Sequence, residues 1–245
     1  MLPAMALRLH YASATDLGRA RRENQDRFLV QEARQLAAVA DGMGGMPCGA
    51  EAAQLAIDSL AAAVRRTPPD DLVGWHTLLE ALNHAVYELG QKLSPFTGIG
   101  TTLTIAHARE GQLRLVHVGD SAAFRLRSST LEQLTAEHTV AAEMLARRNH
   151  DPNTRIPRQA GHTLTSCLGL PYLPSVDVHE TDLQSGDRLL LCSDGLSKPV
   201  EPARIAATLA AAASPAAAVA ALIALANAAG GPDNITAVVA FADPG

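Results

Sequence analysis

The order of strand-like and helix-like segments is the feature that most constrains the fold of this 245-residue chain. The alternation typical of strands occurs over residues 7–15, 26–33, 35–41, 98–110, 111–120, 122–127, 175–183, 187–194 and 234–241. Helical periodicity occurs over residues 48–66, 71–93 and about 138–150, and two Ala-rich helices follow within 203–231. Strands and helices thus come in groups, without the regular alternation of a doubly wound parallel sheet. We predict an α+β fold of largely antiparallel sheets with helices packed outside them.

The length and the composition are compatible with a single domain. Hydrophobic residues make up 47% of the chain and charged residues 18%, which is an ordinary balance for a globular protein with a sizeable core. No internal repeat and no Pro/Gly/Ser-rich linker divides the sequence. We therefore predict one domain over residues 1–245.

Composition argues against several other classes of protein. The formal net charge is −5, no dense basic run is present and aromatic residues are only 3%, so nucleic acid is not an expected partner. The three cysteines, Cys48, Cys167 and Cys192, are scattered without a CxxC motif, which argues against a disulfide framework. The first ten residues lack the apolar core of a signal peptide. These features together predict a cytoplasmic location.

The Ala-rich segment over residues 203–231 is the most membrane-like part of the chain. Its apolarity comes mainly from alanine, which contributes little to insertion into a bilayer. Ser214 followed by Pro215 has the pattern of an N-cap with proline at the first helical position. We expect two packed helices here and no membrane span.

Three aspartates lie next to glycine at the ends of apolar strands, and a fourth follows a pair of glycines just before the last strand. Asp41 in AAVADGMGG, Asp120 in LRLVHVGDS and Asp194 in RLLLCSDGLS each follow a strand, and Asp233 in GGPDNITAVVAF precedes the last one. Each aspartate alone is more typical of a turn than of a ligand. If the strand ends converge, however, their carboxylates could not all ionise without cations between them. Oxygen donors of this kind suit Mg²⁺ and Mn²⁺, and the chain has no HExxH or paired CxxC motif for zinc.

Six short motifs extend this pattern over nearly the whole chain. They are TDLGRARRENQD (15–26), DGMGG (41–45), GTT (100–102), VGDS (118–121), LCSDGL (191–196) and GGPDNIT (230–236). In this order and spacing the sequence resembles the metal-dependent protein serine/threonine phosphatases of type 2C, especially their small stand-alone bacterial members. The resemblance implies a four-layer αββα sandwich, in which two antiparallel sheets are flanked by helix pairs.

The resemblance also implies the cofactors and the residues that hold them. The implied ligands of two core Mn²⁺ or Mg²⁺ ions are Asp26 (through water), Asp41 (bridging both ions), the Gly42 carbonyl, Asp194 and Asp233. Asp120, together with Asp194, matches the position of a third and weaker ion. Arg21 matches the arginine that binds phosphate, and its planar fork suits two phosphate oxygens. Arg21 and Asp41 are thus the implied catalytic residues, and a water between the two ions would attack phosphorus.

The substrate-facing segments depart from the family pattern. GDSAAF places Ala122 where the family commonly has arginine, which predicts a missing surface or substrate contact, and Ser166 stands at another such position. The loop over residues 148–165 is short and unusual. Met43 replaces the histidine of eukaryotic members, and a thioether cannot donate a proton. Protonation of the leaving group would then fall to water, or to a loop histidine such as His150 or His162.

The implied partners are phosphorylated proteins, the products of a serine/threonine kinase, and the chain is expected to be a monomer. One alternative is a catalytically weak pseudophosphatase on the same fold that binds phosphoproteins or a kinase. A second is an esterase of the GDS type with Ser121 as nucleophile, which would need a histidine near the C-terminus. The last histidine is His179, which argues against the esterase.

Overall fold

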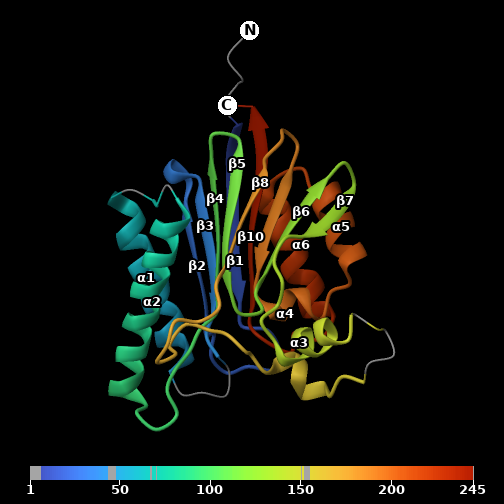
Figure 1. Ribbon diagram of the computed structural model, residues 1–245. Coiled ribbons are helices and arrows are strands. Elements are labelled where there is room, and N and C mark those ends of the chain that lie inside the picture. The colour runs from blue at the N-terminus through green and yellow to red at the C-terminus, as the bar shows by residue number, and fades with distance from the viewer. Residues whose placement is uncertain are drawn as a thin grey trace.

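Two five-stranded antiparallel sheets form the centre of the protein (Figure 1). The structure is a computed structural model that describes residues 7–43, 48–66, 68–69, 71–149, 151 and 155–244. One sheet has the order β1-β10-β9-β6-β7, with strands Leu7–Asp16, Ile235–Pro244, Arg188–Cys192, Ala122–Arg127 and Thr130–Gln133. The other has the order β2-β3-β4-β5-β8, with strands Asp26–Gln31, Leu36–Asp41, Leu103–Arg109, Gln112–Val118 and Asp177–Asp182.

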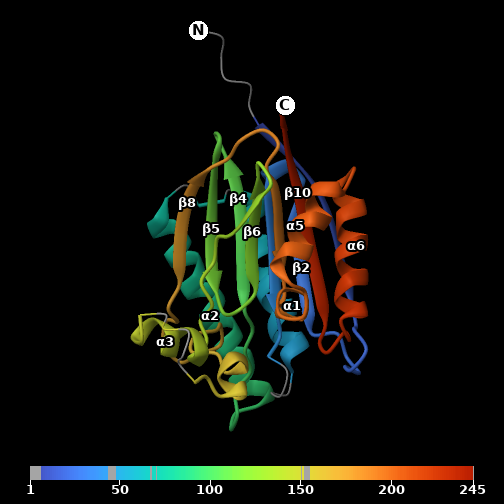
Figure 2. The ribbon, with the colours of Figure 1, turned by 90° about the vertical axis from the view of Figure 1, so that its right-hand side faces the viewer.

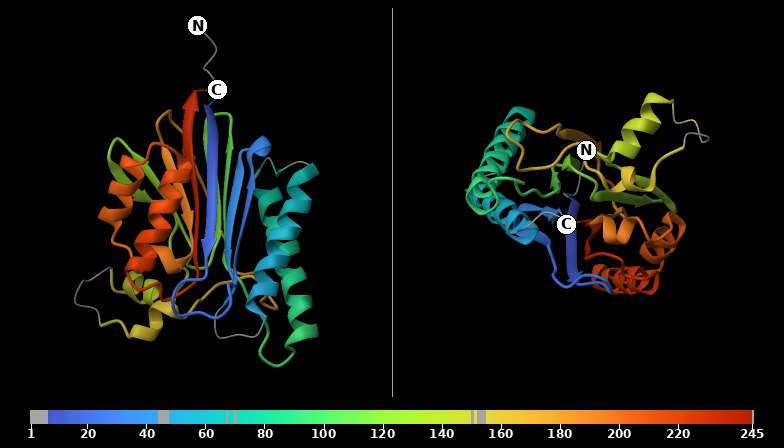
Figure 3. Two further views of the ribbon diagram at one scale, coloured as in Figure 1. Left: turned by 180° about the vertical axis from the view of Figure 1, so that it is seen from behind. Right: turned by 90° about the horizontal axis from the view of Figure 1, so that it is seen from below.

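Helices cover the outer face of each sheet, which gives four layers (Figures 2 and 3). Helices α1 (Gly49–Arg66) and α2 (Leu72–Leu93) lie on the sheet that contains β3, and α5 (Pro202–Ala211) and α6 (Pro215–Ala228) lie on the sheet that contains β10. The predicted α+β sandwich is therefore confirmed. Shorter helices, α3 (Val140–Arg147), α4 (Asp194–Ser197), η1 (Glu32–Arg34) and η2 (Arg158–His162), belong to the connections.

The sequence of β3 shows how the layers are specified. Its residues Leu36, Ala38 and Ala40 belong to the core between the sheet and α1–α2, whereas Ala37 and Val39 belong to the core between the two sheets. All five side chains are fully buried because successive residues of a strand point to opposite faces and both faces are covered. A continuous apolar run is thus what this position in the sandwich requires.

The Ala-rich segment forms two helices, as predicted. The backbone N–H of Ala217 donates to Ser214 Oγ at 3.2 Å, so Ser214 caps α6, and Pro215 occupies the first turn. Among the described residues, no helix combines the length and the apolarity needed to cross a bilayer.

Two elements were not predicted from the sequence. The strand β7 lies at the edge of its sheet and is mostly exposed and polar, so it lacks the alternation of a half-buried strand. The helix α4 has four residues, too few for a helical period to be recognised. Its position matters, because it begins at Asp194.

The strand ends that carry the predicted ligands meet at one end of the sandwich. This is the end that carries α3 and α4, opposite the C-terminal end of β10 (Figure 1). Strand β3 ends there at Asp41, β9 leads there into Asp194, and Asp233 lies just before β10 begins. Antiparallel pairing thus brings together acids that are far apart in sequence.

Candidate active site

Asp26 and Asp41 are direct partners across the β2–β3 ladder. The backbone of Asp41 is held by the GTT segment: its N–H donates to Thr102 Oγ1 at 2.9 Å, and its carbonyl accepts from the Thr102 N–H and the Thr101 hydroxyl, both at 2.9 Å. Both threonines are buried. The GTT motif therefore anchors the end of β3 and fixes where the Asp41 side chain begins.

Glycines let two pairs of segments approach each other closely beside the acids. A Cβ on Gly42 would lie 2.2 Å from the carbonyl oxygen of Gly49, and one on Gly195 would lie 2.0 Å from that of Asn234. Only glycine fits such contacts. The other two glycines of the DGMGG motif, Gly44 and Gly45, lie outside the described residues.

Ser193 and Asn234 make hydrogen bonds around the acidic cluster that were not predicted from the sequence. The Ser193 hydroxyl donates to Asp26 Oδ2 at 2.6 Å and accepts from the Thr236 N–H at 3.0 Å. Asn234 is buried, with 4% of its surface exposed. Its side chain binds the 17–25 segment by accepting from the Gln25 N–H at 2.9 Å and donating to two carbonyls of that segment. Ser193 lies within the LCSDGL motif and Asn234 within GGPDNIT, and this is the sequence signal that could have identified them.

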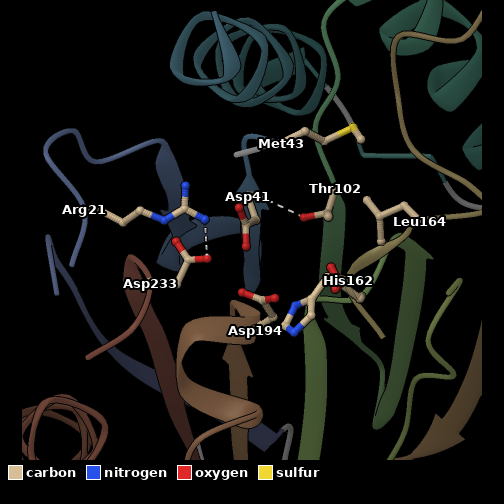
Figure 4. A pocket seen from close by; sticks show the side chains of 9 residues that line it. Arg21, Asp41, Met43, Thr102, His162, Leu164, Asp194 and Asp233 are labelled. Atoms are coloured by element: carbon tan, nitrogen blue, oxygen red, sulfur yellow. Dashed lines mark hydrogen bonds and ion pairs between the residues drawn. The ribbon is translucent and has the colours of Figure 1, made fainter. Parts of the chain in front are cut away.

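Asp233 makes an ion pair with the residue predicted to bind phosphate. The Asn234 N–H donates to Asp233 Oδ1 at 2.8 Å. Arg21 Nη2 donates to Asp233 Oδ2 at 2.6 Å (Figure 4). This hydrogen bond raises the pKa of Arg21, so the guanidinium stays charged. Arg21 is thus placed among the acids.

The acids line one hollow with the predicted loop histidine. The hollow is lined by Arg21, Asp41, Met43, Thr102, Asp120, His162, Leu164, Asp194 and Asp233 (Figure 4). Five of the seven predicted site residues therefore line the hollow. The other two are Asp26, which is buried and pairs with Asp41 across the β2–β3 ladder, and Gly42, which follows Asp41 in the sequence. Of Met43 and His162, only the histidine can donate a proton; His150 lies outside the described residues.

The negative charges of the carboxylates repel one another, because these groups lie close together in a largely buried site. Burial raises the pKa of Asp26 to about 6, although the Ser193 hydrogen bond opposes the shift. Burial and the negative charges of Asp26 and Asp194 raise the pKa of Asp41 well above its ordinary value. Burial and Asp194 also raise the pKa of Asp120. A cation among these groups would remove that cost, because it stabilises the ionised form of each carboxylate.

The donor set fits hard divalent cations. Asp26 Oδ1 is buried and accepts no hydrogen bond within the described structure, so one carboxylate oxygen at the centre of the cluster lacks a partner. Carboxylate and carbonyl oxygens are the ligands that Mn²⁺ and Mg²⁺ take. Among the described residues, no group of three acidic, His or Cys side chains is arranged to hold a metal ion as it stands. Asp233 is paired with Arg21, and Asp120 and Asp194 are paired with Lys198.

The departures from the family pattern have local explanations. Ala122 is 2% exposed and packs in the core between its sheet and α5–α6, so its side chain makes no surface contact. Ser166 is also buried, and its hydroxyl donates to the Ser175 carbonyl at 3.0 Å. Within the loop, η2 brings His162 to the hollow.

Comparison with known proteins identifies the class to which this fold and site belong. The family model of protein phosphatase 2C matches residues 19–228. Serine/threonine protein phosphatase PstP of Mycobacterium tuberculosis is 36% identical over 96% of this chain, and the chain covers 45% of that protein's length. Protein phosphatase PhpP of Streptococcus pneumoniae is 31% identical, with 91% of this chain and 93% of that protein covered.

A solved structure agrees with the sequence matches. The catalytic domain of PstP in complex with two manganese ions superimposes with a TM-score of 0.84 at 35% identity, covering 97% of this chain and all of that one. The chain therefore belongs to the protein phosphatase 2C family.

Proposed function

We propose that this chain is a metal-dependent protein phosphatase that hydrolyses phosphoserine and phosphothreonine on proteins. The observation that carries the proposal is the convergence of Asp26, Asp41, Asp194 and Asp233 from both sheets, with an unpartnered buried oxygen on Asp26. Family membership and the printed names of the relatives, which are serine/threonine protein phosphatases, support it.

Each residue of the cluster has a distinct proposed task. Asp41, Asp194, Asp233 and the Gly42 carbonyl would bind two Mn²⁺ or Mg²⁺ ions, with Asp41 shared between them and Asp26 acting through water. When bound, such ions lower the pKa of water and neutralise phosphoryl oxygens. Arg21 would bind and orient the phosphoryl group through its two forked N–H donors. Ser193 is a positioning residue, because its hydroxyl holds one oxygen of Asp26.

The pseudophosphatase alternative lacks support. Loss of acids would be its signature, yet every predicted ligand is present and lies at the same end of the sandwich. The relatives reported above carry names of phosphatases, and none of those names describes a binding protein.

We also propose the cellular setting. The substrates would be proteins phosphorylated by a serine/threonine kinase, and the chain would act as a single-domain monomer in the cytoplasm. The three cysteines are all free, which suits a reducing compartment. Sedimentation of the purified chain and fractionation of the cells that express it test the monomer and the location.

The direct test is phosphate release from a phosphothreonine peptide and from p-nitrophenyl phosphate. We expect turnover with Mn²⁺ or Mg²⁺ and none after removal of divalent ions with EDTA, and Mn²⁺ added back should restore it. Equal turnover with and without EDTA would exclude metal-assisted hydrolysis. Stoichiometric binding of the phosphopeptide without turnover would favour the pseudophosphatase.

Arg21→Ala is expected to impair catalysis while leaving metal binding intact. Loss of a charged hydrogen bond to phosphate costs about 1.5–3 kcal/mol, so kcat/KM should fall roughly ten- to a hundredfold. Mn²⁺ affinity, measured by calorimetry, should not decrease, because the guanidinium is no ligand and its removal frees Asp233. The neighbouring exposed Arg22→Ala is the matched control and should keep full activity. Weaker Mn²⁺ binding in Arg21→Ala would show that this arginine supports the metal site instead.

A further inference from the structure

Lys198 makes three hydrogen bonds at the edge of the acidic cluster. Its Nζ donates to Asp120 Oδ2 and Asp194 Oδ2, both at 2.7 Å, and to the Gly161 carbonyl at 2.9 Å. These partners come from the end of β5, the start of α4 and η2. An ammonium has three N–H donors, so all of them are used here.

An ordinary surface ion pair does not account for this arrangement. Lys198 and Asp194 are four residues apart, and exposed pairs of that kind stabilise a protein only slightly. Here the side chains of Asp120 and Asp194 are only 8% and 14% exposed, and the third partner is a carbonyl from a separate loop. Glu137 adds a further negative charge nearby. The ammonium therefore lies within a subsite that already favours a cation.

The three oxygens around Lys198 are also a donor set for a divalent ion. Two carboxylate oxygens and one carbonyl oxygen are typical ligands of Mg²⁺ and Mn²⁺. Mg²⁺ binds oxygen at about 2.0–2.1 Å, so an ion on the same two carboxylate oxygens would overlap an ammonium that stands 2.7 Å from each. Only one of the two cations can occupy the space.

We propose that Lys198 is a tethered cation that fills the subsite between Asp120 and Asp194, so that no divalent ion binds there. The sequence predicted a third metal ion between Asp120 and Asp194. The Lys198 ammonium takes the place of that ion. Lys198 contacts Oδ2 of Asp194, so Oδ1 can still serve a core ion. This inference rests on the proposed function in one respect, which is that two divalent ions bind at the core of the site.

The tether has a physical consequence for the site. Because Lys198 is covalently part of the chain, its local concentration at the subsite is fixed. The positive charge between Asp120 and Asp194 therefore does not depend on the metal concentration. It supplies one positive charge where a divalent ion would supply two. The stoichiometry of metal binding should therefore differ between this chain and a variant that lacks the ammonium.

The test counts the Mn²⁺ ions bound per chain, by electron paramagnetic resonance of free Mn²⁺ in a titration. We expect two ions in the wild type and in Lys198→Arg, which retains a cation. Lys198→Met has a similar length without the charge, and it should bind one additional, weaker ion. Adding Asp120→Ala to Lys198→Met should remove that ion, whereas Asp120→Ala alone should leave the count at two.

The outcomes separate this proposal from the proposed function. Three ions in the wild type, or no additional ion in a folded Lys198→Met, would overturn the role of Lys198; thermal melts monitored by circular dichroism establish that the variant is folded. Absence of Mn²⁺-dependent turnover in the wild type would overturn the proposed function instead. The difference in ion count between wild type and Lys198→Met does not depend on turnover.

Discussion

Asp41→Asn is expected to lower kcat by at least about a thousandfold, the upper range for removing one preorganised electrostatic group from an active site. The reason is that a single carboxylate would serve both core ions, and an amide keeps its shape but loses its charge. The backbone should not move, because the peptide groups of Asp41 are held by Thr101 and Thr102. The measurement is kcat with a phosphothreonine peptide at saturating Mn²⁺. Wild-type turnover in this variant would falsify the shared-ligand role.

The same substitution should make the metal-free protein more stable. The pKa of Asp41 is raised in the folded chain by burial and by Asp26 and Asp194. At neutral pH the unfolded chain therefore holds the ionised carboxylate more favourably than the folded chain does, and Asp41 lowers the free energy of unfolding. Asparagine removes this cost, so Tm in EDTA should rise.

Asp58→Asn, on the exposed face of α1, is the matched control for both measurements. It should leave kcat unchanged, and Tm in EDTA should not rise. A lower Tm of Asp41→Asn in EDTA would contradict the repulsion among the acids.

Gly195→Ala is expected to damage folding and metal binding together. The added Cβ would lie 2.0 Å from the Asn234 carbonyl oxygen and 3.2 Å from the Asp233 Cβ. The backbone must then move, and overpacking of this kind costs about 1–3 kcal/mol, equivalent to a fall in Tm of roughly 2–12 °C for a chain of this size. The displaced segment carries Asp233, so Mn²⁺ affinity should fall with stability. Melting curves and calorimetry measure the two effects.

Gly161→Ala is the matched control for this prediction. Among the described residues other than its two chain neighbours, no atom lies within 4 Å of the position of its Cβ, and its backbone is not in the left-handed region. Stability and Mn²⁺ affinity should therefore be close to those of the wild type. An unchanged Tm in Gly195→Ala would show that the contact between α4 and the start of β10 is looser than the structure indicates.

The layers of the sandwich were predictable because burial is encoded locally. In β3, successive apolar residues from Leu36 to Ala40 face different cores, which requires an uninterrupted apolar run. Elements without such a local signal were missed. The strand β7 is an exposed edge, and α4 is shorter than two helical turns.

The sequence was enough to identify the acids that are candidates for the site. Asp41, Asp120 and Asp194 each follow an apolar strand, which makes them candidate ligands if those strand ends converge. Neighbouring strands of an antiparallel sheet end at opposite edges, so the fold decides whether they converge. The family motifs extended that expectation to Arg21, Asp26 and Asp233. Their roles as ligands stay predictions until metal binding is measured.

Which side chains pair with which acids depends on the three-dimensional packing of the chain. Arg21 reaches Asp233 across 212 positions of sequence, Ser193 reaches Asp26 across 167, and Lys198 reaches Asp120 across 78. No local pattern encodes these pairs, because each depends on how the two sheets and their connecting loops superimpose. Lys198 follows Asp194 by one helical turn and could have been predicted as an ordinary i,i+4 partner. Lys198 also binds Asp120 and Gly161 because β5, α4 and η2 pack together at this end of the sandwich. This packing decides which cation occupies the subsite.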